Sequence, residues 1–560
     1  MKYSQFLFIC LFYCLSINCE QLVKIEQGLI EGTTMKTRNG REISIFLGIP
    51  YAEPPIGARR FSNPIPARKW NGIRLANREG NFCPQIEING LIGEEDCLYL
   101  NVFTPQVNFN KSKQINKNDL LPVMVRIHGG GFLVGSSNFT YYGPNYLLDK
   151  EIILVSINYR LGILGFFATK DSVVPGNFGL KDQVLALKWI KRNIKYFGGD
   201  PKRVTLFGES AGGACVGFHA ISDASNGLFH QYIFQSGSVL GPWAFRSRRN
   251  LNPYVKQLIK NVNCPDGNST IILNCLREKS IFKLLNAVPY DGFNFSKLAW
   301  IPTDEIESKD AFITDTPMNL IRQNKIKDYP SMSGNVGDEG LPVTLSFYAN
   351  GKDYQSMLLA LETYINSTAY HYTKSNNIEK FRKIIQNFYF NESVLADKDQ
   401  IRTSFTKFVS DCRFNYPQVM LLENMKKLIK SPFYLYLFNY RGNESVVSLE
   451  NGIKGNVGVT HGEELLYHFP KVPLSDATKV DQRMIDIMVD LWTSFAINGE
   501  PKSNLLTASD LWQPYMRNAT FLQIGNPTNN NDPSISLNHD FFNDRMNFWK
   551  ENFPSSQFSI

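Results

Sequence analysis

The sequence has no apolar segment beyond its first twenty residues that approaches the ~20 residues of a transmembrane helix. It also has no internal repeat at the periods of solenoid or propeller proteins. Its formal net charge of +8 is spread over 560 residues, without a dense basic block in which aromatic residues alternate with Lys and Arg. These absences argue against a membrane channel, a repeat protein and a nucleic-acid-binding protein. With 43% hydrophobic and 20% charged residues, the composition is that of a globular protein with a large core.

The N-terminus has the pattern of a secretory signal. Lys2 precedes an apolar run from Phe6 to Leu15, and small or polar residues follow, so we expect cleavage after Cys19. The last residues, 541–560, are polar and aromatic and suit neither a lipid-anchor signal nor an ER-retention tag. We therefore expect residues 1–19 to be a signal peptide and residues 20–560 to form one secreted, extracellular domain.

Cysteines are few, and three of the nine lie in the predicted signal. In an oxidising compartment, the close pairs Cys83/Cys97 and Cys264/Cys275 are natural disulfides, although six cysteines formally allow fifteen connectivities. Cys215 lies in an apolar helix and is expected to be a buried free thiol, whereas Cys412 stays undecided. Secretion also makes the Asn-x-Ser/Thr sites candidates for glycosylation. They are Asn110, Asn138, Asn268, Asn294, Asn366, Asn391, Asn443 and Asn518.

The order of the expected elements indicates an α/β fold. Short β-branched runs over 123–127, 152–157 and 204–207 predict strands, and 180–196 has the period of a long amphipathic helix. Strands that alternate with helices favour a large, mostly parallel central sheet with helices on both faces. Residues 250–430 are mainly helical without a Pro/Gly/Ser linker, so we expect an inserted helical subdomain that covers the active-site gorge.

A serine between two glycines is the first candidate for chemistry. Gly208-Glu209-Ser210-Ala211-Gly212 follows a predicted strand and opens a helix of small residues. A serine at so tight a strand-to-helix turn has a strained backbone and an exposed Oγ, and the helix N-terminus favours developing negative charge. We expect Ser210 to be a nucleophile.

A run of three glycines supports that interpretation. His128-Gly129-Gly130-Gly131-Phe132 follows another predicted strand, where glycines would cost stability unless the backbone N–H groups were needed. Acyl transfer requires N–H donors aimed at a tetrahedral oxyanion. We assign this role to Gly130, Gly131 and Ala211.

A nucleophilic serine needs a base and a third group that orients the base. Of the seven histidines, His461 lies in a glycine-punctuated loop ahead of a helix, a better setting than those of the others. In this architecture the acid lies between the serine and the histidine in the chain. Many carboxylates fall in that interval, and spacing does not choose among them.

Longer motifs resemble one family. They are Phe46-Leu47-Gly48-Ile49-Pro50-Tyr51-Ala52-Glu53-Pro54-Pro55, Glu95-Asp96-Cys97-Leu98-Tyr99-Leu100-Asn101, Asn158-Tyr159-Arg160-Leu161-Gly162 and Gln235-Ser236-Gly237-Ser238, together with the serine motif. From about residue 28 to residue 549 the chain is similar to the type-B carboxylesterase and cholinesterase family, and it looks most like the insect-type carboxylesterases. The resemblance implies the α/β-hydrolase fold and no metal or other cofactor.

The resemblance also supplies residues that spacing leaves open. The acid of the family lies in an Asp-Glu-Gly run after a proline-led strand, which corresponds here to Glu339, with Asp338 as its local rival. The implied disulfides are Cys83–Cys97 and Cys264–Cys275, and the implied structural ion pairs are Arg60–Glu95 and Arg160–Asp182. Trp243 resembles the acyl-pocket residue of the family, although core packing is a nearly equal interpretation.

Departures from the family pattern narrow the range of expected substrates. Cholinesterases carry a tryptophan for the substrate cation inside the first disulfide loop, whereas residues 84–96 contain no aromatic residue, so choline esters are not expected as the main substrate. Cys412 also lacks a partner near the C-terminus. Esterases of juvenile hormone usually have glutamine before the serine and aspartate three residues after the histidine, where this chain has Glu209 and Glu464.

Together these features predict a secreted serine carboxylesterase, a monomer or homodimer, that hydrolyses small carboxylic esters through an acyl-enzyme. A juvenile-hormone-type esterase is an alternative with the same chemistry. A non-catalytic binding protein of the same fold is an alternative of another class, although such relatives usually lose the serine. A sequestering esterase, which binds a toxin or hormone stoichiometrically and turns over slowly, is a further alternative that the sequence leaves open.

Overall fold

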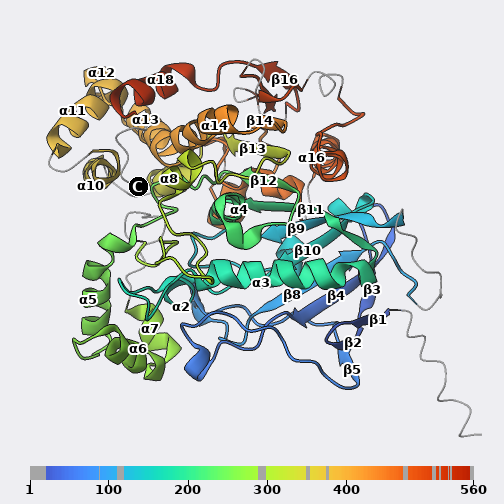
Figure 1. Ribbon diagram of the computed structural model, residues 1–560. Coiled ribbons are helices and arrows are strands. Elements are labelled where there is room, and N and C mark those ends of the chain that lie inside the picture. Colours follow the sequence, from blue (N-terminus) through green and yellow to red (C-terminus); the bar gives the residue numbers. More distant parts are fainter. Residues whose placement is uncertain are drawn as a thin grey trace, which may run out of the picture.

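The computed structural model describes residues 21–554 except 88, 110–118, 288–297, 349–353, 374–376, 454, 471–476, 507–511, 516–518, 527–528 and 530–531 (Figure 1). The predicted signal peptide and three of the candidate glycosylation sites, Asn110, Asn294 and Asn518, therefore lie outside the described residues.

An 11-stranded sheet forms the centre of the fold, in the order β16-β15-β14-β13-β12-β11-β9-β10-β8-β4-β3. Neighbours from β10 through β9, β11, β12, β13 and β14 to β15 are parallel, and the pairs at both edges are antiparallel. The strands are β3 (Thr33–Lys36), β4 (Glu42–Pro50), β8 (Tyr99–Thr104), β9 (Leu121–Ile127), β10 (Ile153–Ile157), β11 (Gly199–Glu209), β12 (Gln231–Gln235), β13 (Ser331–Val336), β14 (Phe433–Phe438), β15 (Phe521–Ile524) and β16 (Ile535–Asn538). This arrangement confirms the predicted α/β fold with a mostly parallel central sheet.

The smaller strands lie apart from this sheet. β1 (Leu22–Ile25), β2 (Gly28–Glu31) and β5 (Ile73–Leu75) form a three-stranded sheet, and β6 (Gln85–Glu87) pairs with β7 (Gly90–Ile92) inside the first disulfide loop.

Helices cover both faces of the sheet (Figure 1). In the first half of the chain they are α1 (Phe139–Tyr142), α2 (Gly162–Phe166), α3 (Phe178–Asn193), α4 (Ala211–Ile221), α5 (Asn252–Asn261), α6 (Ser269–Glu278) and α7 (Ile281–Asn286). In the second half they are α8 (Pro317–Arg322), α9 (Leu341–Thr344), α10 (Tyr354–Tyr372), α11 (Ile378–Tyr389), α12 (Glu392–Leu395), α13 (Lys398–Ser410), the π-helix η9 (Asp411–Asn415), α14 (Tyr416–Leu428), α15 (Val446–Asn451), the 3-10 helix η10 (Glu463–Tyr467), α16 (Lys479–Asn498) and α18 (Asn543–Asn552).

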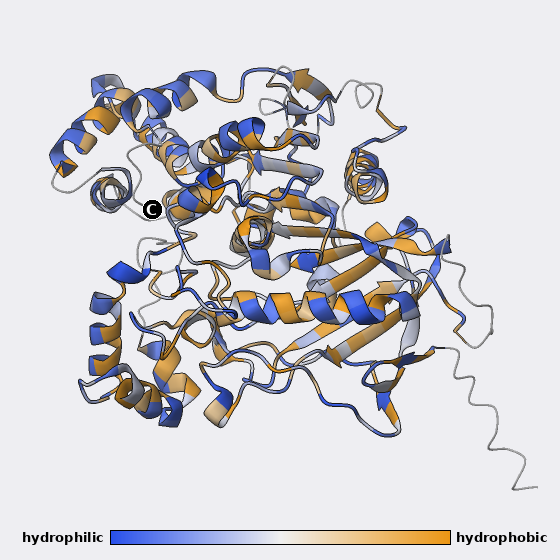
Figure 2. Cartoon of the chain, in the orientation of Figure 1, coloured by the Kyte–Doolittle hydropathy of each residue, from blue (hydrophilic) through white to orange (hydrophobic). Residues whose placement is uncertain are grey.

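Side-chain pattern explains why these segments adopt these elements. β10 is wholly buried and rich in β-branched residues, which suits a central parallel strand. α3 carries polar residues on one side and apolar residues on the other, visible as alternating blue and orange in Figure 2. α16 begins with a capping box between Thr478 and Asp481 and ends at Gly499, which has a left-handed φ of 76°. No helix within the described ranges is apolar over enough residues to traverse a bilayer.

The segment from residue 250 to residue 430 contains the helices α5 to α14, and it also contributes a strand to the sheet. β13 lies in its middle and pairs with β12 and β14 at the centre of the sheet. The helices therefore form two groups, α5–α8 before this strand and α9–α14 after it. β13 ends at Val336, and Gly337 alone separates it from Asp338 and Glu339, so the sheet fixes the position of the segment that carries the candidate acid.

Candidate active site

Ser210 lies between the end of β11 and the start of α4. Its backbone has φ 58° and ψ −125°, a conformation that costs an L-residue of order 1–3 kcal/mol and that clusters at functional sites. The turn is tied to the end of β12, because the Ser210 N–H donates to the Gln235 carbonyl at 2.9 Å. α4 lies so close to β9 that a Cβ at Gly212 would lie 2.2 Å from the Ile127 carbonyl oxygen, so the position requires glycine. The turn thus presents the serine at the C-terminal ends of the parallel strands.

The glycine run after β9 borders this turn. A Cβ at Gly129 would lie 3.1 Å from the Ser210 Cβ, which shows how closely the two segments approach. Gly130 has φ 102°, and a Cβ there would lie 2.1 Å from the Val134 carbonyl oxygen. Within the described chain, the N–H groups of Gly130, Gly131 and Ala211 make no hydrogen bond. Three backbone donors beside one serine are the arrangement that an oxyanion requires.

His461 and Glu339 are neighbours in space although they lie 122 residues apart in the chain. His461 Nδ1 lies 2.5 Å from Glu339 Oε2, and the other oxygen of Glu339 accepts from the Val336 N–H at 2.9 Å. The Glu339 side chain has no exposed surface. A buried carboxylate on Nδ1 fixes the ring orientation and leaves Nε2 for proton transfer.

Asp338, the local rival for the acid, points to the backbone of the histidine loop. Its Oδ2 accepts from the Val459 N–H at 3.0 Å, and its own N–H donates to the Val459 carbonyl at 2.9 Å. Asp338 and Thr460 form an isolated parallel β-bridge. Of the two carboxylates, only Glu339 contacts the His461 ring.

Two further glutamates surround His461. Its Nε2 lies 3.0 Å from Glu209 Oε1, and no hydrogen bond joins it to Ser210 Oγ among the described residues. Glu464 is buried behind it and accepts from Gln235 Nε2 at 3.1 Å. Burial lowers the pKa of His461, but the charges of Glu209, Glu339 and Glu464 raise it to about 9. Burial and the two other glutamates raise the pKa of Glu464 to about 8.

Aromatic side chains line one side of the site. Trp243, 1% exposed, has its ring centroid 5.8 Å from that of Phe414, and the Phe414 ring lies 4.8 Å from the His461 ring. Trp243 Nε1 donates to the Arg413 carbonyl at 3.0 Å. The sequence did not point to Phe414, because it lies in a segment with a continuous helical pattern. Glu209, in contrast, could have been identified from the sequence, because it is a charged residue directly before the serine.

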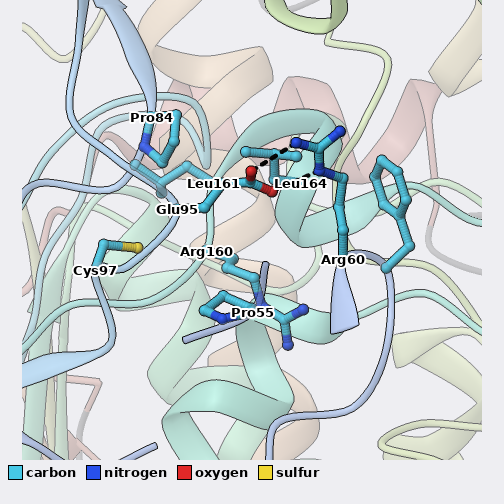
Figure 3. Close-up of a pocket in the computed structure, with 9 residues that line it drawn as sticks. Pro55, Arg60, Pro84, Glu95, Cys97, Arg160, Leu161 and Leu164 are labelled. Carbon is cyan, nitrogen blue, oxygen red and sulfur yellow. Dashed lines mark hydrogen bonds and ion pairs between the residues drawn. The ribbon is translucent and has the colours of Figure 1, made fainter. Parts of the chain in front are cut away.

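The ion pairs that the resemblance implies are present, and neither is among the groups that act on His461. Nε and one terminal nitrogen of Arg60 each donate to an oxygen of Glu95 at 2.6 Å, in a pocket that Cys97 and Arg160 also line (Figure 3). Arg160 holds Asp182 through two side-chain hydrogen bonds of 2.8 and 2.7 Å. Both pairs are mostly shielded from water, which suits a structural role.

Cysteines and glycosylation candidates complete the predicted residues. Disulfides join Cys83 to Cys97 and Cys264 to Cys275, and Cys215 and Cys412 are buried free thiols. Asn268, Asn391 and Asn443 are exposed, and Asn366 is half-buried. Asn138 is half-buried and its Nδ2, the atom that a glycan would occupy, donates to Glu79 at 3.3 Å. The use of these sites stays a prediction.

Comparison with known proteins agrees with this geometry. The profile described as "Carboxylesterase family" matches residues 19–549. "Esterase FE4" of Myzus persicae is 37% identical over 92% of this chain and 90% of its own length. "Juvenile hormone esterase" of Tribolium castaneum is 33% identical over 99% of this chain and 100% of its own. "Venom carboxylesterase-6" of Apis mellifera is 33% identical over 98% of both chains.

Proposed function

This chain belongs to the carboxylesterase family and is a carboxylic ester hydrolase, and we propose that it is a secreted enzyme that acts through Ser210, His461 and Glu339. The observation that carries the proposal is the convergence of three loops from distant parts of the chain. The strained serine, the unpaired N–H groups beside it and a carboxylate-bound histidine all border one site.

The proposed reaction has two acyl transfers. His461 Nε2 accepts the Ser210 proton while Oγ attacks the ester carbonyl, and Gly130, Gly131 and Ala211 donate to the resulting oxyanion. Glu339 keeps the imidazole in the tautomer that can accept this proton and stabilises its charged form. The alcohol leaves with the proton from Nε2, and water then releases the acid by the same steps. Since Nε2 lies against Glu209 in the structure, the first step includes its approach to Oγ.

Several observations support secretion. The apolar run from Phe6 to Leu15 has the length of a signal peptide, and two disulfides are typical of an oxidising compartment. A relative that is named as a venom carboxylesterase spans nearly the whole chain. Expression of the full chain in insect cells, with N-terminal sequencing of the protein in the medium, tests this part. We expect a mature chain that begins at or near Glu20, and retention of the full-length chain inside the cells would contradict it.

The proposed substrates are small carboxylic esters without a quaternary ammonium group. The loop between Cys83 and Cys97 has no aromatic side chain that could hold such a cation. A relative named as a juvenile hormone esterase covers the chain, so a hormone ester is the second candidate, although Glu209 and Glu464 depart from the pattern of such enzymes. Rates on 4-nitrophenyl butyrate, butyrylthiocholine and juvenile hormone rank these classes, and we expect the aryl ester to be hydrolysed fastest.

Fluorophosphonate labelling beside the 4-nitrophenyl butyrate assay tests the nucleophile. We expect the wild type to label at Ser210 and to turn over, and Ser210→Ala to lose both. Ser308→Ala is the matched control, because Ser308 is an exposed serine. A wild type that neither labels nor hydrolyses would refute the enzyme. A wild type that labels fully but hydrolyses slowly would favour the sequestering alternative.

A further inference from the structure

A buried arginine, Arg413, directly precedes Phe414, whose ring lies against that of His461. Arg413 belongs to the π-helix Asp411–Asn415, an irregularity that appears frequently at functional sites. Its side chain is 0% exposed, and none of its three guanidinium nitrogens has a hydrogen-bond partner in the described chain. Guanidinium is always protonated in proteins, so this is a full charge with unused donors.

The groups around Arg413 are neutral hydroxyls, and that of Tyr364 interacts with the guanidinium itself. Its Cζ lies 5.0 Å from the centroid of the Tyr364 ring on α10. The hydroxyls of Tyr364 and, one helical turn later, Thr368 are buried, and neither has a hydrogen-bond partner within 3.5 Å among the described residues. The nearest groups that interact with them are the Arg413 guanidinium and the Cys412 thiol, respectively. The same face of α10 contacts the π-helix again through Tyr372, whose hydroxyl donates to the Cys412 carbonyl. This buried cluster therefore holds a guanidinium and two hydroxyls, and no salt bridge joins the guanidinium to a carboxylate among the described residues.

No carboxylate of the described chain pairs with Arg413. Asp411, its neighbour in sequence, accepts from Tyr389 at 2.7 Å and pairs with Arg545 at 3.3 Å. A second positive charge lies nearby, because among the described residues Arg246 donates to the Tyr254 hydroxyl and the Leu298 carbonyl and pairs with no carboxylate. Burial, followed by the charges of Arg413 and Arg246, lowers the pKa of the half-buried His371 to about 3. His371 is therefore neutral and adds no further positive charge.

A buried charge without a counter-ion is strongly unfavourable, and buried polar groups without partners call for an unseen water or ion. Water could accept some of the hydrogen bonds but would leave the charge uncompensated. An oxyanion would accept the hydrogen bonds and would also balance the charge. A planar carboxylate accepts two parallel hydrogen bonds from a guanidinium and further bonds from hydroxyls. We propose that Arg413, Tyr364 and Thr368 form a buried anion site that takes a carboxylate.

The position of the site links it to the bound acyl group. The Arg413 carbonyl accepts from Trp243, and the next residue, Phe414, lies against the His461 ring. A carboxylate here has two sources. It is either the distal end of an acyl chain bound at Ser210 or a free small carboxylate taken up from solution. The first source rests on the proposed esterase function, whereas the second does not.

Thermal unfolding tests the site independently of turnover. Sodium acetate is compared with sodium chloride at equal ionic strength, for the wild type, Arg413→Met, Tyr364→Phe and the control Arg68→Met, whose side chain is 81% exposed. We expect acetate to raise the Tm of the wild type and of Arg68→Met by about 2 °C, to raise that of Tyr364→Phe less, and to leave Arg413→Met unchanged. Tyr364→Phe keeps the arginine, so it tests the site even if Arg413→Met does not fold. Equal Tm values in both salts for the wild type, or equal rises for all variants, would overturn the site.

Substrate pairs then identify the source of the carboxylate. The 4-nitrophenyl monoester of adipic acid is compared with 4-nitrophenyl hexanoate, which has the same chain length but no carboxylate. If the acyl chain supplies the group, Arg413→Met lowers kcat/KM for the monoester about 10-fold or more relative to the hexanoate. An unchanged ratio together with the acetate effect assigns the site to a free carboxylate. A wild type that hydrolyses neither ester fails the proposed function, and the Tm series still decides whether the site exists.

Discussion

The two sides of the candidate site differ in which chemical groups form them, backbone on one side and side chains on the other. The oxyanion side consists of backbone, with Gly130, Gly131 and Ala211 presenting N–H groups from one loop and one helix N-terminus. The acid–base side consists of side chains, with Glu209, Glu339 and Glu464 around the single ring of His461. The backbone side is neutral and fixed by steric fit, whereas the side-chain side carries several interacting charges. Changes on the first side should therefore alter the rate without altering its pH dependence, and changes on the second should alter both.

The largest effect is expected from the acid. Glu339→Gln should lower kcat about 10⁴-fold, because the amide would favour the wrong tautomer of His461 and could not stabilise its charged form. The measurement is steady-state hydrolysis of 4-nitrophenyl butyrate at saturating substrate. A loss of less than about 10-fold would mean that another carboxylate orients the ring.

A methyl group on the oxyanion side should cost less. Gly130→Ala places a Cβ against the Val134 carbonyl oxygen and would shift the N–H donor, so we expect kcat to fall about 10²–10³-fold. The pH dependence should not change. Gly40→Ala is the matched control, since Gly40 has φ 81° but open space around its Cβ position. If both variants lose activity equally, the loss reflects backbone strain and not the oxyanion.

Glu209→Gln tests whether the charged side sets the pH dependence. His461 must be neutral to accept a proton, so activity should rise as the pH rises through its pKa, which is about 9. Burial opposes the charged form, and Glu209 is the first of the groups that favour it. Removal of the Glu209 charge should therefore move the rising limb of kcat/KM to lower pH. A limb at the same pH as in the wild type would show that Glu209 does not act on His461.

The smallest effect is expected at Asp338. Asp338→Asn keeps an oxygen that can accept from the Val459 N–H, so kcat should stay within about 3-fold of the wild type. Asp338→Ala removes this acceptor, loosens the loop of His461 and should therefore lower kcat further. A kcat that is higher in Asp338→Asn than in Asp338→Ala would show that the hydrogen bond, and not the charge, is what matters. A collapse of activity in Asp338→Asn would reverse the assignment of the acid.

Much of the fold could be predicted from local patterns. The β-branched runs at 123–127 and 204–207 lie within β9 and β11, and β11 extends back to Gly199 because its pairing with β9 resumes there after a register shift. The helix expected over 180–196 ends as an α-helix at Asn193 and continues as a 3-10 turn, which the helical period does not distinguish. β13 could not be placed by the same means, since its partners β12 and β14 are distant in sequence.

The two sides of the site also differ in how well local sequence patterns predict them. Ser210 and the glycine run are visible in the sequence because backbone geometry demands particular residues at consecutive positions. Glu339 needed the resemblance to a family, because any carboxylate in a long interval could fold against His461. The contacts of Glu209 and Phe414 with His461 depend on tertiary packing alone, and no local pattern encodes them.

The β-bridge between Asp338 and Thr460 has an evolutionary consequence. It ties the loop of the candidate acid directly to the loop of the candidate base, so their separation does not depend on the length or shape of the chain between them. That intervening segment contains the helices of the second group, including Phe414 and Arg413. Insertions, deletions and substitutions there could diversify which esters are accepted, while the proton-transfer partners keep their register. The architecture thus lets selectivity and chemistry evolve separately.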